Sequence, residues 1–211
     1  MARTLPALVL LSCLVAGQGW AGDAWRAEYE VEDGGARQAL VVVRDATRVE
    51  YRGDGAAPPR IWRRLDDGVE RTEVFADRGA AVVASPGDLR TLDELPEWDT
   101  LAGVVPATLR DSLPATGRVT RFDRAATRHA GVDAQGRRAV LEWLDDVGLP
   151  ADYRAGDYRL RLRSLQRVPG AEAFTAIADL RAYDRADLGD MPLDPFARDY
   201  LDRFGKHRHA H

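Results

Sequence analysis

Apolar and polar residues alternate strictly in two well-separated stretches of the chain. In residues 25–32 every second side chain is apolar and the others are charged, and in residues 158–163 a tyrosine and two leucines alternate with three arginines. A period of two places successive side chains on opposite faces of a β-strand. Both stretches are therefore predicted as strands with one apolar and one solvated face.

Shorter apolar runs between these two stretches are bounded by turn residues such as Asp-Gly and Gly-Gly. This pattern is typical of antiparallel hairpins. We favour strand also for residues 172–183, which fit a helix as well. The other predicted strands cover residues 40–44, 48–52, 60–64, 69–75, 80–84, 118–122, 127–130 and 138–144.

Helix signals replace the alternation between residues 85 and 113, where prolines interrupt the chain repeatedly. Ser85 followed by Pro86 is typical of a helix start, with a capping residue and then proline in the first turn. We expect two or three short helices here, lying across one face or one mouth of the sheet.

A last helix is predicted from Asp194, as N-cap, and Pro195, with Gly205 placed to end it. Three of its aromatic residues recur every four positions and make one stripe. We interpret this stripe as docking on the domain's own core; a cover over a cavity is the alternative. The stripe consists of Phe196, Tyr200 and Phe204.

A long antiparallel sheet cannot leave an apolar face in water. We therefore predict a mainly β fold: an unclosed antiparallel β-barrel, or half-barrel, with short helices against its concave face, plus the C-terminal helix. Each apolar side chain taken alone is typical of a core, but together they suit a pocket for a hydrophobic ligand. These candidate ligand-binding residues are Trp25, Tyr29, Val41, Val43, Tyr51, Trp62, Leu141, Trp143, Leu160 and Leu162.

The N-terminus has the order of a secretory signal peptide: a positive charge at Arg3, an apolar run over residues 5–15 and then small residues. We expect cleavage near Ala21. A retained membrane anchor is the alternative, but the run is too short to cross a bilayer. The only cysteine, Cys13, lies in this segment, in a context that loosely resembles a bacterial lipoprotein cleavage site. Cleavage near Ala21 would leave a mature chain without thiol or disulfide chemistry.

The composition of the mature chain limits its partners. Removal of one positive charge changes the formal net charge from −4 to −5, and charges of both signs are interleaved without a basic stripe. Nucleic acid is therefore not expected as a partner. No helix-length apolar run follows the signal, so we expect no transmembrane segment in the mature chain and export to the periplasm of a Gram-negative bacterium.

Side chains for enzymatic catalysis are scarce. The mature chain would contain no cysteine, it has no Gly-x-Ser-x-Gly motif, and His129 is the only histidine before the C-terminal tail. Its adjacent carboxylate pairs fall largely in turns, where aspartate commonly stabilises the backbone. We expect a protein that is not an enzyme.

The C-terminal tail carries an imidazole at every second residue, His207, His209 and His211. Such a group suits copper, nickel or zinc. Ordering a flexible end costs entropy, so unselective binding is the alternative to a specific metal site. No other cofactor is expected.

The segment Trp-Leu-Asp-x-x-x-Leu-Pro at residues 143–150 leads from one predicted strand into a new one. Together with the hairpin strands around Ile61–Arg64 and Phe75, it makes residues 25–168 similar to the outer-membrane lipoprotein carrier superfamily (LolA-like proteins). The resemblance implies a half-barrel that binds acyl chains. The chain differs in lacking a helix before the first strand and in adding a C-terminal helix and a histidine tail.

These observations predict a signal peptide over 1–21, a LolA-like β domain over 22–192, the C-terminal helix over 193–205 and the histidine-containing tail over 206–211. The leading functional hypothesis is non-enzymatic binding of a hydrophobic small molecule, lipid or lipoprotein in the concave sheet, with an envelope protein as a further partner. The alternatives are a metal-handling envelope protein that uses the tail, and a structural or adaptor module with no ligand.

Overall fold

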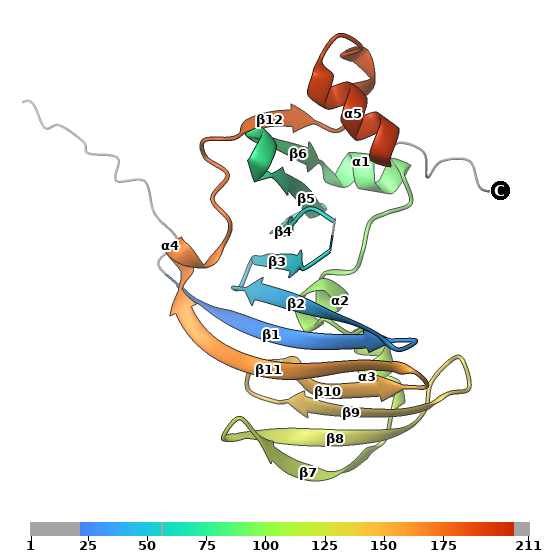
Figure 1. Ribbon diagram of the computed structural model, residues 1–211. Coiled ribbons are helices and arrows are strands. Elements are labelled where there is room, and N and C mark those ends of the chain that lie inside the picture. Colours follow the sequence, from blue (N-terminus) through green and yellow to red (C-terminus); the bar gives the residue numbers. More distant parts are fainter. Residues whose placement is uncertain (1–21, 56, 205–211) are drawn as a thin grey trace, which may run out of the picture.

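A computed structural model describes residues 22–55 and 57–204, and in them one open sheet dominates (Figure 1). Twelve strands of the described chain lie in the spatial order β12-β6-β5-β4-β3-β2-β1-β11-β10-β9-β8-β7. Every neighbouring pair is antiparallel except β12 and β6, which are parallel. The predicted mainly β, unclosed half-barrel is confirmed. The strands are β1 (Asp23–Asp33), β2 (Ala36–Arg44), β3 (Arg48–Gly53), β4 (Arg60–Leu65), β5 (Gly68–Phe75), β6 (Ala80–Ala84), β7 (Ala115–Arg121), β8 (Arg124–Val132), β9 (Arg138–Leu144), β10 (Leu149–Ala155), β11 (Tyr158–Pro169) and β12 (Arg181–Asp184).

Short helices connect and cover these strands. Between residues 85 and 113, where two or three short helices were expected, the structure has three. The first begins as predicted, since the Ser85 hydroxyl accepts a hydrogen bond from the Asp88 N–H at 3.2 Å. None of the described helices is both long and apolar enough to cross a bilayer. The helices are α1 (Pro86–Thr91), α2 (Trp98–Gly103), α3 (Ala107–Ser112), α4 (Gly170–Ala173) and α5 (Pro195–Phe204), with single 3₁₀ turns η1 (Ala76–Arg78) and η2 (Asp187–Asp190).

The strand prediction for residues 172–183 is wrong over most of its length. α4 ends at Ala173, the following residues have no regular structure, and only Arg181–Asp184 form the edge strand β12. Half of the apolar residues of this segment are alanine, which carries little β preference.

The main core lies on the concave face of the sheet, between β1–β3 and β9–β11. Leu141, Leu144, Leu149 and Leu160 are almost completely buried there. Leu101 of α2, together with Val105 and Leu113, belongs to the same cluster, so α2 and α3 cover this face. We call these two helices the helix cover.

Val41 and Val43 lie on the opposite, convex face, which corrects the prediction that they belong to the concave one. Val43 pairs in register with Arg26 and Glu50, and it packs with Ala24 and Ala173. All four residues from Leu40 to Val43 are apolar, so alternation alone does not reveal which pair points to which side.

A second cluster joins α5 to β5, β6 and β12 at the far end of the same face (Figure 1). Tyr200 and Ala197 are fully buried there against Ala80 and Val82, and Phe196 stacks on Tyr183 with ring centroids 4.7 Å apart. The interpretation that the aromatic stripe docks on the core is confirmed.

Asp194 begins α5, as predicted. Its carboxylate accepts hydrogen bonds from the N–H groups of Phe196 (2.9 Å) and Ala197 (3.1 Å) and from the Tyr183 hydroxyl (3.2 Å), and it pairs with Arg181 at 3.0 Å. The hydrogen bond from Ala197 is the main reason that the pKa of Asp194 is lowered; burial opposes it, and Tyr183, Phe196 and Arg181 add to it.

Docking of α5 is therefore expected to weaken in acid. The pKa of Asp194 in the folded protein lies below the unfolded value of about 3.9, so its ionised carboxylate stabilises the docked helix. This stabilisation is complete above about pH 4 and is lost as the pH falls through the native pKa. Amide hydrogen exchange of α5 between pH 5 and pH 2 measures this. Asp194→Asn keeps a capping acceptor that does not titrate, so the variant should lose part of the acid dependence; identical profiles would contradict the role of Asp194.

Candidate functional site

Eight of the ten candidate ligand-binding residues are brought together on the concave face, and Val41 and Val43 are not. Six of the eight are buried, whereas Trp25 and Tyr51 are half-buried and pack against the same cluster. The face is closed by the helix cover, so most of these side chains are core residues in this conformation. The eight are Trp25, Tyr29, Tyr51, Trp62, Leu141, Trp143, Leu160 and Leu162.

The last turn of α2 is fastened to the sheet through its main-chain carbonyl groups. The Arg44 guanidinium donates from Nη1 to the Ala102 carbonyl (2.6 Å) and the Gly148 carbonyl (3.1 Å), and from Nη2 to the Val147 carbonyl. The Tyr51 hydroxyl donates to the Leu101 carbonyl at 2.5 Å. One side chain of β2 thus ties the helix cover to the turn between β9 and β10.

Two hollows open on either side of this attachment, and Arg44 and Ala102 line both of them. One has a volume of about 350 Å³ and runs between Trp25 and Trp98. The other has a volume of about 230 Å³ and runs beside Trp143. They give access from solvent to the edge of the helix cover.

Arginines lie over the tryptophans that line these hollows. The guanidinium carbon of Arg110 is 5.1 Å from the Trp143 ring centroid, and that of Arg124 is 4.8 Å from the Trp25 ring centroid. Cation–π pairs of this kind combine an apolar surface with positive charge. The mouth of the concave face therefore combines apolar tryptophan rings with charged side chains of both signs, since Asp23, Asp45 and Asp99 line the same hollows.

Tyr29 contributes an unusual polar atom to the apolar interior. Its side chain is 2% exposed, and its hydroxyl has no hydrogen-bond partner within 22–55 and 57–204. Burial strongly raises the pKa of Tyr29; the Tyr51 hydroxyl raises it further and the charge of Arg44 lowers it. Burial is also the main cause of the lowered pKa of Arg44.

Arg44 and Trp98 are site residues that the sequence prediction missed. Arg44 lies two residues after Val42 and directly opposite Trp25, so the alternation places it on the concave face. The sequence offered no signal for this, because the preceding run Leu40–Val43 is apolar throughout and arginine is usually exposed.

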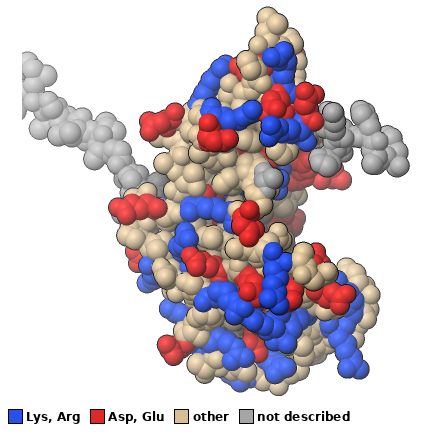
Figure 2. Space-filling view, in the orientation of Figure 1, with Lys and Arg blue, Asp and Glu red and all other residues tan. Residues whose placement is uncertain are grey.

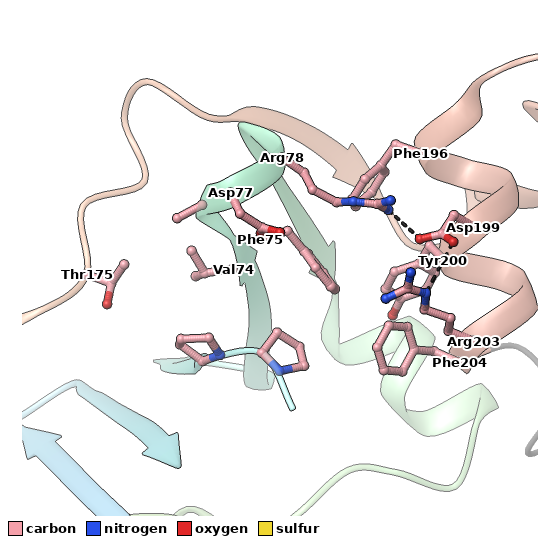
Figure 3. A pocket seen from close by; sticks show the side chains of 13 residues that line it. Val74, Phe75, Asp77, Arg78, Thr175, Phe196, Asp199, Tyr200, Arg203 and Phe204 are labelled. Atoms are coloured by element: carbon pink, nitrogen blue, oxygen red, sulfur yellow. Dashed lines mark hydrogen bonds and ion pairs between the residues drawn. The ribbon is translucent and has the colours of Figure 1, made fainter. Parts of the chain in front are cut away.

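A further cavity of about 310 Å³ lies between α5, the end of β5 and the loop at Pro58–Pro59 (Figure 3). Its walls include the rings of Phe75 and Phe204, and Asp199 binds both Arg78 and Arg203 at its edge. The aromatic stripe thus lines a cavity as well as docking on the core.

Metal-binding side chains do not cluster in the described part of the chain. No set of three His, Cys, Asp or Glu residues there has a metal-binding arrangement. The Nδ1 atom of His129 is 2.9 Å from the Leu113 carbonyl oxygen, an arrangement that suits a structural hydrogen bond. The predicted signal peptide with Cys13, and the tail with His207, His209 and His211, lie outside the described residues.

No family model matches the chain, and no curated protein matches it. Three solved structures are similar in fold. A structure of PNGF-II has a TM-score of 0.48 and 8% identity, covering 81% of this chain and 32% of the other. An uncharacterized conserved protein from Thermus thermophilus has a TM-score of 0.45 and 12% identity, covering 77% and 90%. MucB from the Pseudomonas aeruginosa MucA/MucB complex has a TM-score of 0.45 and 17% identity, covering 77% and 59%.

The chain thus spans about a third of the PNGF-II chain and about three fifths of the chain from the MucA/MucB complex. Since every one of these TM-scores lies below 0.5, we draw no functional conclusion from the likenesses.

Proposed function

We propose that this protein is a non-enzymatic, periplasmic binder of a hydrophobic ligand, an acyl chain of a lipid or lipoprotein, which it holds on the concave face of the sheet. The observation that carries the proposal is the helix cover: an extensive apolar face is closed by short helices, and solvent-open hollows flank the point where α2 is attached.

The stability of the helix cover depends on its contacts with the sheet. α2 and α3 are six residues long each, which is too short for independent stability. Hydrogen bonds from Arg44 and Tyr51, and burial of Leu101, hold α2 in place. An acyl chain that takes the place of Leu101 against the sheet would replace the lost apolar contacts.

Burial of alkyl carbons would supply the binding free energy, at about 0.8 kcal/mol per methylene. The tryptophans at the mouth, Trp25, Trp98 and Trp143, offer flat apolar surfaces along which a chain can enter. None of this requires a nucleophile or a metal.

A substitution that adds bulk at the wall shared by the two hollows tests the proposal. Ala102 lines both and is half-buried, so Ala102→Phe adds bulk there. Fluorescence titration with the neutral apolar probe N-phenyl-1-naphthylamine should show binding to the unaltered protein, and about tenfold weaker binding to the variant, equivalent to about 1.4 kcal/mol.

Thr108→Phe is the matched control, because Thr108 is exposed on α3 and lines neither hollow. It should bind the probe as the unaltered protein does. Equal affinity of all three proteins would place the ligand elsewhere, and no binding by any of them would contradict the proposed function.

A further inference from the structure

The positive charge of this mildly acidic chain is concentrated at one end of the sheet. Residues 115–169, which form β7–β11, contain eleven arginines and seven carboxylates, a formal net charge of +4. The other described residues, 22–55, 57–114 and 170–204, contain sixteen arginines and 27 carboxylates, a net charge of −11. Basic side chains are accordingly densest in the lower part of Figure 2, where Figure 1 places these five strands.

Most of these arginines lie on the convex face of β7–β11. Arg128, Glu142, Asp152 and Arg161 pair in register across β8–β11 and therefore share one face. Leu141, next to Glu142, belongs to the concave core, so this row lies on the side away from the helix cover. Arginines at even spacing from the row along their strands, and the arginine of β7 that binds Glu142, complete what we call the arginine face. It consists of Arg121, Arg128, Arg138, Arg154, Arg159, Arg161 and Arg163.

The two carboxylates of β7–β11 on this face are buried beneath the arginines. Glu142 is 6% exposed and Asp152 is 9% exposed. Arg121 binds Glu142 at 2.7 Å, and Arg154 and Arg159 bind Asp152 at 2.8 and 2.9 Å. Solvent therefore meets mainly guanidinium groups, which the alternation of signs along the sequence does not reveal.

Two members of the arginine face have free charges. Arg128 and Arg138 are both exposed, and neither has an ion-pair partner among residues 22–55 and 57–204. At the border with β1, Arg163 pairs with Glu30 at 2.7 Å. The positive charge of the face is thus only partly neutralised by the protein itself.

The chemistry of the arginine face suits phosphate groups spread over a surface. Guanidinium groups bind phosphate in bidentate fashion. Five adjacent strands distribute them over about 19 Å, at about 4.8 Å per strand, which is wider than one small anion. No residue of β7–β11 on this face is aromatic, whereas protein interfaces and sites for single-stranded nucleic acid are typically rich in aromatic residues.

We infer that the arginine face binds the surface of a membrane that contains anionic phospholipids, with β7–β11 against the headgroups. The acidic remainder of the chain is repelled by the same surface, which favours one orientation of the protein. This inference goes beyond the proposed function and does not depend on it, because the arginine face and the helix cover lie on opposite sides of the sheet.

Flotation with lipid vesicles tests the inference. At about 0.1 M salt the Debye length is about 10 Å, so the membrane interacts with the nearest face of the protein more than with its net charge. The protein should then float with phosphatidylglycerol vesicles and not with phosphatidylcholine vesicles. At about 1 M salt, where the Debye length is about 3 Å, the binding should be lost.

The double variant Arg128→Gln/Arg138→Gln removes two exposed charges that have no partner in the described chain, so it should fold. Its affinity for phosphatidylglycerol vesicles should fall about thirtyfold. Arg64→Gln/Arg198→Gln is the matched control, because it changes the net charge equally at exposed residues of β4 and α5. It should bind the vesicles as the unaltered protein does.

No binding to phosphatidylglycerol vesicles, or equal binding to both kinds of vesicle, would overturn the inference. Equal weakening in the two double variants would overturn it as well, because net charge alone would then explain the binding. Both variants should bind N-phenyl-1-naphthylamine as the unaltered protein does, so a failure of the proposed function is seen separately.

Discussion

Replacing Glu50 by alanine is expected to lower the free energy of unfolding by about 3–5 kcal/mol, the cost of breaking a buried ion pair by removing one partner. Glu50 is 0% exposed on the convex face. Its carboxylate accepts from Arg52 Nε (2.7 Å) and Nη2 (2.6 Å) and from the Thr175 N–H (2.9 Å). The variant would leave the Arg52 guanidinium and the Thr175 amide without this partner.

Loss of the Glu50 carboxylate should also increase the mobility of the segment that leads to β12. Glu50 binds the Thr175 amide, and Arg52, which Glu50 positions, binds the Ala173 carbonyl. Chemical denaturation gives the free energy. Glu28→Ala is the control, since Glu28 forms a half-exposed pair with Arg26 and pairs of that kind contribute about 1 kcal/mol or less. Equal effects of the two substitutions would contradict the role given to Glu50.

Replacing Arg44 by methionine is expected to lower the free energy of unfolding by about 2–3 kcal/mol, because three main-chain carbonyls lose a charged donor. The effect should be concentrated in α2, whose amide protons should exchange with solvent about tenfold faster or more. Hydrogen exchange resolved by peptide measures this directly.

Arg64→Met is the matched control. Arg64 is exposed, and its guanidinium carbon lies 5.9 Å from the Trp98 ring centroid. It should change the exchange of α2 little. If α2 exchanged equally slowly in the Arg44→Met variant, packing of Leu101 and its neighbours would hold the cover without the arginine.

Much of the fold follows from local patterns. Alternation at Trp25–Val31 and Tyr158–Leu162 identified β1 and β11, which pair side by side in the sheet. Capping residues at Ser85 and Asp194 identified the starts of α1 and α5. Each of these signals lies within a few residues of the element it predicts.

Signals that depend on tertiary context were missed. The bounds of β10 were not predicted, because Pro150 and the buried Asp152 interrupt the alternation in its sequence. Asp152 is acceptable there only because Arg154 and Arg159, the latter from the neighbouring strand, pair with it at 2.8 and 2.9 Å.

The candidate site, too, was predictable from local patterns only in part. Eight apolar residues of the concave face could be predicted from the sequence, but parity failed in the apolar run Leu40–Val43. The attachment of α2 could not, since Arg44 meets Ala102 and Val147 across 58 and 103 residues of sequence. Figure 2 shows many acidic and basic side chains interleaved on one face, and nothing in that pattern singles out an arginine that turns inward.

Native mass spectrometry of the protein purified gently from its own host tests the central claim most directly. The account predicts a co-purifying lipid or acyl mass on the unaltered protein and on Thr108→Phe, and its loss from a folded Ala102→Phe variant. A bare polypeptide mass that stays bare when acyl ligands are added would contradict the claim that the concave face binds a hydrophobic ligand.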